Sequence, residues 1–209
     1  MSEGSFNSIS KNIITSSPYT IYQAGILATI VTGDPKYILF SVFAFIMGDG
    51  FNALEKKIAK QIAKKIMGDD SSVGQRPSGC GRGQSTTDCT GCGIYPSHGS
   101  ESKTWGMPSG HAQITSFAAT FWTLYVWLKY KNETDPDAKR LAKIKAIAST
   151  VVMWTLASGI WSQRVISSCH TIPQIIVGVI FGILFGVLAY FISTFIIKDM
   201  PSFKSPTVE

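Results

Sequence analysis

The chain has 209 residues, which is enough for one domain and hardly more. Only 15% of the residues are charged, whereas 45% are hydrophobic, so the composition excludes a disordered chain, a fibrous protein and a small disulfide scaffold. The 19 basic and 13 acidic residues leave long stretches of the chain without charge, and these stretches define the predicted elements.

Five stretches that are nearly free of charge are predicted to be membrane-spanning helices. A helix needs roughly 20 mainly apolar residues to cross the hydrocarbon core of a bilayer. The predicted spans are residues 18–33, 36–54, 110–129, 146–163 and 172–197. The sequence therefore predicts an all-α integral membrane bundle of about five to six spans over residues 18–198, between a polar N-terminal tail (1–17) and a polar C-terminal tail (199–209).

The second predicted span carries an acid and leads into a basic helix. Asp49 stands between two glycines and is either a functional acid inside the membrane or a residue at the surface where the helix emerges. In residues 52–67, Ile58, Ile62 and Ile66 recur every four residues and lysines fill many of the other positions. We expect this amphipathic helix to continue the second span and to lie along the membrane surface, where its lysines attract anionic head groups or bind substrate directly.

The loop between the second and third spans, residues 68–105, is rich in Gly, Ser, Thr and Pro. A loop of this length in a compact domain is usually functional or disordered. Its Cys80, Cys89 and Cys92 leave a disulfide, free thiols or a zinc site open, and we favour a disulfide because the loop is expected to face an oxidising compartment. Cys169 is expected only to pack against its neighbours.

The charges of the connecting segments predict how the bundle is oriented. Residues 129–145, between the third and fourth spans, carry six basic residues against three acidic ones, which favours the cytoplasmic side. Span parity then places the loop 68–105 and the segment before the fifth span together on the luminal or extracytoplasmic face. Asn132 begins an N-glycosylation sequon, which should stay unmodified if it is cytoplasmic.

Three short motifs fall on that shared face. They are Gln75-Arg76-Pro77, the run Gly-Met-Pro-Ser-Gly-His-Ala-Gln at residues 106–113, and Arg164-x5-His170-x3-Gln174. In the second motif Ser109 suits a helix N-cap, and the backbone amides that follow it can bind a phosphate-like anion at the positive end of the helix dipole. His111 would then be placed to give a proton to a leaving oxygen.

The third motif opens the fifth span with a histidine that is predicted to face the bundle. At a spacing of four residues, His170 and Gln174 share a helix face with Gly178 and two further glycines, a stripe that lets another helix pack closely. A bundle-facing imidazole near an arginine is suited to attack a phosphoryl group. Arg76 and Arg164 would hold the phosphoryl oxygens.

These motifs resemble those of the type 2 phosphatidic acid phosphatase (PAP2) superfamily, whose pattern is Lys-x6-Arg-Pro, Pro-Ser-Gly-His and Ser-Arg-x5-His-x3-Asp. The Gly-Met-Pro-Ser-x-His-x-Gln and His-Thr-x-x-Gln sequences are similar to the dolichyl-diphosphatase branch. The resemblance implies hydrolysis through a phosphohistidine, without a metal ion or another cofactor. In that scheme His170 is the nucleophile and His111 the general acid, and Arg164, Arg76, Ser109 and the Gly110 amide neutralise the phosphoryl group.

Three positions depart from the family pattern. Asp69 stands where the first motif has its lysine, and a short insertion would give that role to Lys64 or Lys65, of which Lys65 is the substrate-binding candidate. Gln163 replaces the serine before Arg164, and Gln174 replaces the aspartate of the third motif. A glutamine can fix the tautomer of an imidazole but cannot offset the charge of an imidazolium, so we expect a shifted pH profile.

The leading functional hypothesis is an integral membrane lipid phosphatase with a polyprenyl or dolichyl diphosphate as the favoured substrate, the endoplasmic reticulum being one candidate membrane. The expected partners are the lipid phosphate and the bilayer, with no nucleic acid. The alternatives are a phosphatidate-type lipid monophosphatase and a membrane protein that binds anions without turning them over.

Overall fold

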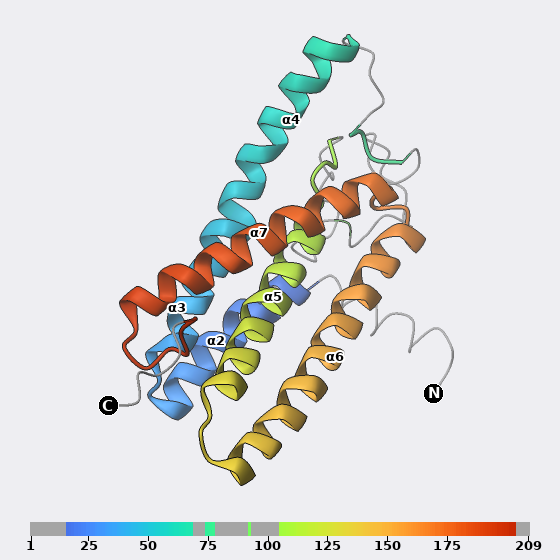
Figure 1. Cartoon of the computed structure of the whole chain (residues 1–209). Helices are drawn as coiled ribbons and strands as arrows, with labels where there is room; N and C mark the ends of the chain where they lie inside the picture. Colours follow the sequence, from blue (N-terminus) through green and yellow to red (C-terminus); the bar gives the residue numbers. More distant parts are fainter. Residues whose placement is uncertain (1–15, 69–73, 78–91, 93–104, 204–209) are drawn as a thin grey trace.

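The computed structural model describes residues 16–68, 74–77, 92 and 105–203, and these residues are helical, as predicted, with a single isolated β-bridge and no strand. In chain order the helices are α2 (Ser17–Thr32), α3 (Pro35–Phe43), η1 (Ala44–Gly50), α4 (Phe51–Met67), α5 (Gly110–Asn132), α6 (Pro136–Ile166) and α7 (Ile172–Ile196). Figure 1 shows that α5 lies in the middle of the bundle.

The first two helices form a hairpin whose turn falls between the predicted spans 18–33 and 36–54. Gly33 closes α2 with a positive φ of 70°, which favours glycine, and the side chain of Asp34 caps α3 by accepting a hydrogen bond from the Lys36 N–H at 3.0 Å. After α3 the chain passes through η1, a π-helical turn, and continues as α4, so Pro35–Met67 is one uninterrupted helix. The basic helix therefore continues the second span, as predicted.

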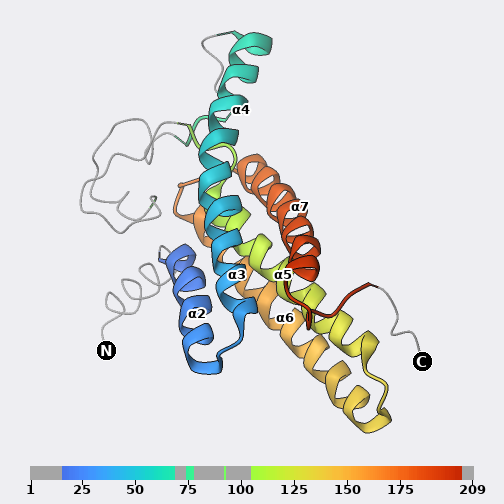
Figure 2. The same cartoon turned by 90° about the vertical axis from the view of Figure 1, so that its left-hand side faces the viewer.

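Helix α4 extends beyond the bundle in nearly the direction of α3 and passes the ends of α5 and α7 (Figures 1 and 2). Its place along a membrane surface stays a prediction. Asp49, at the end of η1, accepts a hydrogen bond from the Tyr22 hydroxyl at 2.8 Å. The acid therefore links η1 to α2 inside the bundle and does not belong to the site formed by the three motifs.

Helices α5 and α7 pack closely along the predicted glycine stripe. A Cβ on Gly178 would lie 2.5 Å from the Ser109 carbonyl oxygen, and Gly182 and Gly186 face the α5 backbone in the same way. Only glycine permits this approach, so the stripe is a packing surface. Below it, aromatic residues of α3, α5 and α7 form the core: Phe40, Phe117, Phe121 and Tyr190.

Within the described part of the chain, three helical segments are long and apolar enough to cross a membrane: Pro35–Met67, Pro136–Ile166 and Ile172–Ile196. Their outward faces expose large hydrophobic side chains, which is the pattern of a protein surrounded by lipid. The predicted spans 18–33 and 110–129 are not among the three. Helix α2 has only 16 residues, and α5 is less apolar because it buries a row of polar side chains, among them His111, Gln113 and Ser116.

Candidate active site

The three motifs come together at one end of the bundle. Helix α5 begins there, α6 ends there and α7 begins there, as Figure 1 shows. The Ser109 N–H, just before α5, donates to the Gln174 carbonyl oxygen in the first turn of α7 at 3.1 Å. His111 and His170, near the starts of these two helices, therefore lie at the same end of the molecule, and each is 2% exposed.

The first motif is attached to the second by a short backbone pairing. Gln75 and Trp105 form an antiparallel bridge, and the Gly106 N–H donates to the Gly74 carbonyl oxygen at 2.8 Å. The Trp105 ring lies where a side chain on Gly74 would stand, and Gly74 has a φ of 88°, so this position favours glycine for both reasons. The pairing carries Arg76 to the start of α7.

The hydrogen bonds of Gln174 assign the tautomer of His170. The Gln174 Nε2 donates at 2.7 Å to the Gln75 carbonyl, a group that can only accept, so Oε1 is the atom that faces His170. That oxygen lies 3.0 Å from His170 Nδ1 and also accepts from the Thr171 N–H at 3.3 Å. His170 Nδ1 therefore carries the hydrogen, and the lone pair is on Nε2.

The Nε2 atom of His170 lies next to a buried guanidinium. Arg76 Nη1 is 3.4 Å from His170 Nε2 and donates to the Cys169 carbonyl oxygen at 2.7 Å. Burial lowers the pKa of Arg76 to about 10, which leaves it positively charged near neutral pH. Burial, reinforced by the charges of Arg76 and Arg164, holds the pKa of His170 well below its usual range. A neutral imidazole with an available Nε2 lone pair is the form that can act as a nucleophile.

Arg164 is held by the turn that carries His170. Its carbonyl oxygen accepts from the N–H groups of Cys169 and His170 at 3.0 and 3.1 Å, and its Nη2 donates to the Cys92 carbonyl oxygen at 2.7 Å. The side chain is 2% exposed. The chain thus reverses between α6 and α7 and places the arginine and the histidine of the third motif in contact with the same short turn.

Cys92 and Cys169 form a disulfide, so the expectation that Cys169 only packs is wrong. A disulfide at Cys92 also removes this residue from a zinc site. The carbonyl oxygens of the two bonded cysteines accept the hydrogen bonds of the two site arginines, Arg164 and Arg76 respectively. The disulfide therefore joins the loop to the turn that holds both arginines. Cys80 and Cys89 lie outside the described residues.

The start of α5 agrees with the sequence prediction. Ser109 has extended backbone angles, is fully buried, and its Oγ accepts from the Ala112 N–H at 3.4 Å, so it is the N-cap. Gly110 lies against α4, where a Cβ would be 3.1 Å from Asn52 Oδ1.

Asn52 is a polar contact that sequence reasoning missed. Its Nδ2 donates to Gln113 Oε1 at 2.7 Å, and Gln113 Nε2 donates in turn to the Met47 carbonyl oxygen in η1 at 2.9 Å. Asn52 is 3% exposed. It stands on the same face of α4 as the buried Ala63, and this spacing of eleven residues was the signal that could have identified it.

The structure does not bring Lys65 to the other site residues. Lys65 is exposed near the far end of α4, and the lysine whose charge acts on His170 is Lys56, one turn after Asn52. Lys56 and Lys65 are nine residues apart, about 13 Å along the helix axis. The lysines of α4 therefore differ in their distance from His170, which the composition of the helix does not reveal.

The helical bundle and its apolar outward faces are consistent with a membrane protein, and His111, His170, Arg76 and Arg164 are all buried at one end of it. The family model of the PAP2 superfamily matches residues 59–198, which is more than half of the chain. The chain therefore belongs to the PAP2 superfamily, whose members are phosphatases, and it is a phosphoric ester hydrolase by family. It matches none of the curated proteins and none of the solved structures with which it was compared.

Proposed function

We propose that the protein is an integral membrane lipid phosphatase that works through a phosphohistidine on His170. The observation that carries the proposal is the chain of hydrogen bonds from the Gln75 carbonyl through Gln174 to His170 Nδ1. This chain fixes the lone pair on Nε2, at the atom that lies beside the Arg76 guanidinium. A nucleophile and a cation for the phosphoryl oxygens thus share one buried position.

The proposed reaction has two steps. In the first, His170 Nε2 bonds to phosphorus, the bond from phosphorus to the leaving oxygen breaks, and His111 gives its proton to that oxygen. In the second, His111 takes a proton from water, the water oxygen bonds to phosphorus, and the N–P bond breaks to release inorganic phosphate. Arg76, Arg164 and the first amides of α5 neutralise the charge on the transferring group.

The proposal includes a topology of five membrane crossings with the site on the luminal or extracytoplasmic face. The end of α5 and the start of α6, which together carry the six basic residues of 129–145, are at the opposite end of the bundle from the motifs (Figure 1). Basic connections favour the cytoplasm, which supports this orientation. The side chain of Asn132 donates to the Ser202 carbonyl oxygen at 3.1 Å, and glycan on Asn132 in a eukaryotic host would contradict the orientation.

The first prediction concerns the substrate. The purified full-length protein should release phosphate from lipid phosphates in the presence of chelator, and we propose polyprenyl or dolichyl diphosphate as the preferred class. A panel that contains a polyprenyl diphosphate, a polyprenyl monophosphate and phosphatidate measures the preference. A higher kcat/KM for phosphatidate would favour the lipid monophosphatase. Equal phosphate release by the wild type and His170→Ala would contradict catalysis by His170 and leave the anion-binding protein without turnover as the alternative.

The second prediction concerns pH. Because the pKa of His170 is held well below 6.5, the nucleophile should stay neutral as the pH falls through 6.5, and the formation of the phosphoenzyme should keep its rate there. Gln174→Glu places a carboxylate beside Nδ1, which raises the pKa of His170 and should shift the acid limb to higher pH. Rapid-quench measurement of phosphoenzyme formation from pH 5 to 8 tests this. An acid limb near 6.5 in the wild type would contradict the assigned environment.

The third prediction compares two lysines of α4. Lys56→Met should raise KM about tenfold, because a charge that reaches the site is lost, whereas Lys65→Met should leave kcat and KM within twofold of the wild type. The two substitutions remove the same charge from the same helix, so Lys65→Met controls for the loss of membrane attraction. A larger effect of Lys65→Met would return the substrate-binding role to Lys65.

A further inference from the structure

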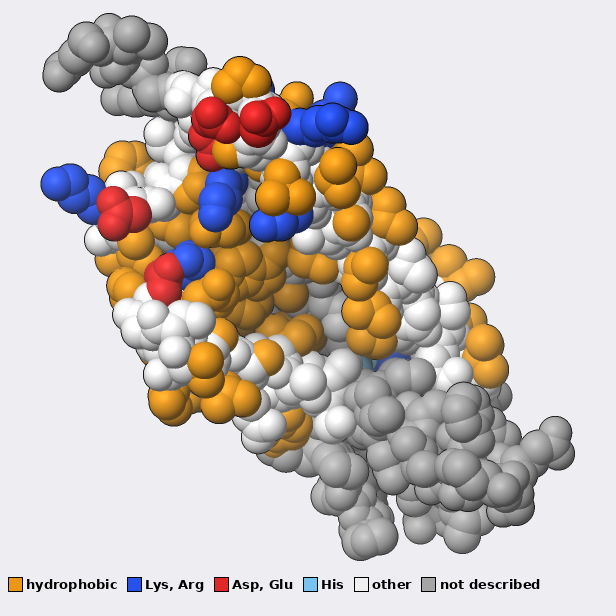
Figure 3. Space-filling view, turned by 90° about the horizontal axis from the view of Figure 1, so that it is seen from below, with side chains coloured by type: hydrophobic (Ala, Val, Ile, Leu, Met, Phe, Trp, Pro, Cys, Tyr) orange, Lys and Arg blue, Asp and Glu red, His pale blue; other side chains and the backbone are white. Residues whose placement is uncertain are grey.

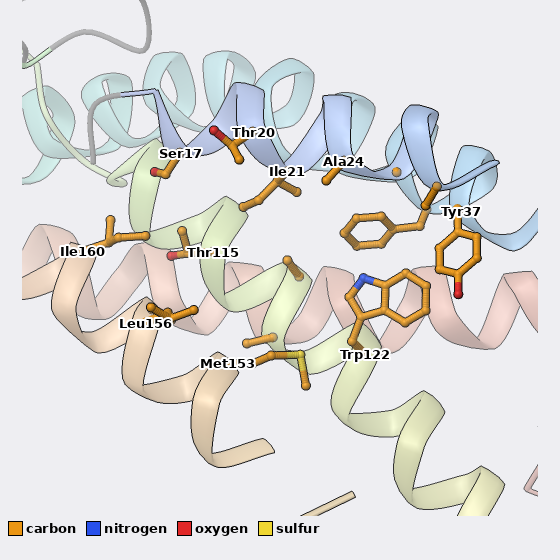
Figure 4. Close-up of a pocket in the computed structure, with 16 residues that line it drawn as sticks. Ser17, Thr20, Ile21, Ala24, Tyr37, Thr115, Trp122, Met153, Leu156 and Ile160 are labelled. Carbon is orange, nitrogen blue, oxygen red and sulfur yellow. The ribbon is translucent and has the colours of Figure 1, made fainter. Parts of the chain in front are cut away.

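An apolar groove lies between α2 and α6, below the candidate active site. Its volume is about 520 Å³, a size typical of binding sites for small molecules. Helix α5 forms its floor, and α6 packs mainly against α5 and not against α2, so a space remains between the two outer helices. Figure 3 shows a hollow floored by hydrophobic side chains on this face, and Figure 4 shows the side chains that line the groove.

The floor of the groove is continuous with the position of His111. On α5, His111, Thr115, Ala118 and Trp122 follow one another at spacings of three and four residues and so share one face of the helix, and the last three line the groove. The Thr115 hydroxyl donates to the His111 carbonyl oxygen at 2.7 Å. The groove thus begins one helical turn from the proposed general acid.

The two ends of the groove differ in chemistry. At the end near His111, Figure 4 shows Ser17, Thr20 and Thr115, and the Ser17 hydroxyl is buried, lines the groove and has no hydrogen-bond partner among the residues that the structure describes. Ser17 is 8% exposed. A buried hydroxyl without a partner is costly, so a polar atom of a ligand at this end would satisfy it. At the other end the rings of Tyr37 and Trp122 line an apolar wall.

The length of the groove matches one leaflet of a bilayer. The residues of α2 that line it run from Ser17 to Ala28, a distance of about 16 Å along the helix axis, which is about half of the roughly 30 Å hydrocarbon core. A ligand that fits these observations has a polar end at the level of Ser17 and a long hydrocarbon chain that extends into one leaflet.

We propose that this groove binds the hydrocarbon chain of the lipid phosphate substrate and that Ser17 hydrogen-bonds an oxygen of the head group next to the phosphorus that His170 attacks. The inference rests on the proposed function and deepens it: it names a single long hydrocarbon chain, held between α2 and α6, as the feature that the enzyme recognises. The substrate would enter sideways from the leaflet, because the space between α2 and α6 is not closed by packing between these two helices.

The test fills the groove with a bulky side chain. Ala24 of α2 lines the groove and is exposed, so Ala24→Trp adds a ring without disturbing the packed core, and Ala148→Trp makes the same change at an exposed position of α6 outside the groove. With an isoprenoid or alkyl phosphate of long chain, kcat/KM should fall at least tenfold in Ala24→Trp and stay within twofold in Ala148→Trp. With a soluble alkyl phosphate of four to six carbons, both variants should match the wild type. An equal loss with both substrates, or no loss with either, overturns the groove proposal.

A second measurement separates this inference from the proposed function. A lipid phosphate with a diazirine in its chain, added to His170→Ala in membranes, should label residues of α2 and α6 that line the groove, and Ala24→Trp in the same background should abolish that labelling. If the groove is labelled but the wild type does not turn over lipid phosphates, the groove proposal stands and the proposed phosphatase function is contradicted. If the wild type turns over lipid phosphates but the label is found only outside the groove, the phosphatase function stands and the groove proposal is contradicted.

Discussion

Replacing His170 with glutamine is expected to lower kcat/KM by about 10³-fold or more for every substrate, because the atom that bonds to phosphorus is removed. His111→Gln should behave differently. A lipid monophosphate loses an alkoxide, a poor leaving group that needs a proton, whereas a nitrophenyl phosphate does not. His111→Gln should therefore slow the formation of the phosphoenzyme by about 10²-fold or more with the lipid and hardly at all with the nitrophenyl ester.

The pair of variants tests the two roles separately. Acid-labile ³²P label on the protein should accumulate in His111→Gln with the nitrophenyl ester, since the second step also needs His111, and should be absent in His170→Gln. Equal losses with both leaving groups in His111→Gln would contradict its role as the general acid. Label retained in His170→Gln would place the nucleophile on another residue.

Loss of the Cys92–Cys169 disulfide is expected to be the second large effect. The bond closes a loop with a sequence separation of 77, which corresponds to about 4 kcal/mol of stability in the chain-entropy account. It also holds the two carbonyl groups to which Arg164 and Arg76 donate. Cys92→Ser, Cys169→Ser and the double variant should therefore each lose about tenfold or more in kcat and lower the midpoint of thermal unfolding.

The single variants should lose as much activity as the double variant, because the two cysteines act as one unit. A membrane-permeant reductant should lower the activity of the wild type to the level of the variants and leave the variants unchanged. Losses that add up in the double variant would mean that the cysteines act independently. Full activity of the reduced wild type would show that the arginines keep their positions without the disulfide.

The sequence was informative where local chemistry decides the structure. The N-cap at Ser109 and the glycine stripe of α7 follow from rules that act within a few residues, and the structure has both. The convergence of the three motifs follows from the order of the helices. These predictions needed no knowledge of which side chains meet in space.

The contacts that the sequence could not supply are those between distant segments. Cysteine spacing does not determine disulfide connectivity, so the sequence could not predict that Cys92 pairs with Cys169. Lys56 and Lys65 look alike in composition, and only the packing of α4 distinguishes them. Gln174 was expected to fix the tautomer of His170, but its contact with the first motif was not predicted. In the structure it joins Gln75 to His170, a task that needs an amide, because a carboxylate could not donate to the Gln75 carbonyl.

The hydrogen bonds of Gln113 have a consequence for exchanging parts between related proteins. Gln113 binds both Asn52 of α4 and the Met47 carbonyl of η1, so the helix that begins with the second motif also sets the register of the helix before it. A chimera that takes α4 from one homologue and α5 from another would break this alignment unless both amides are transferred together. Helices α4 and α5 should therefore be exchanged between homologues only as one unit.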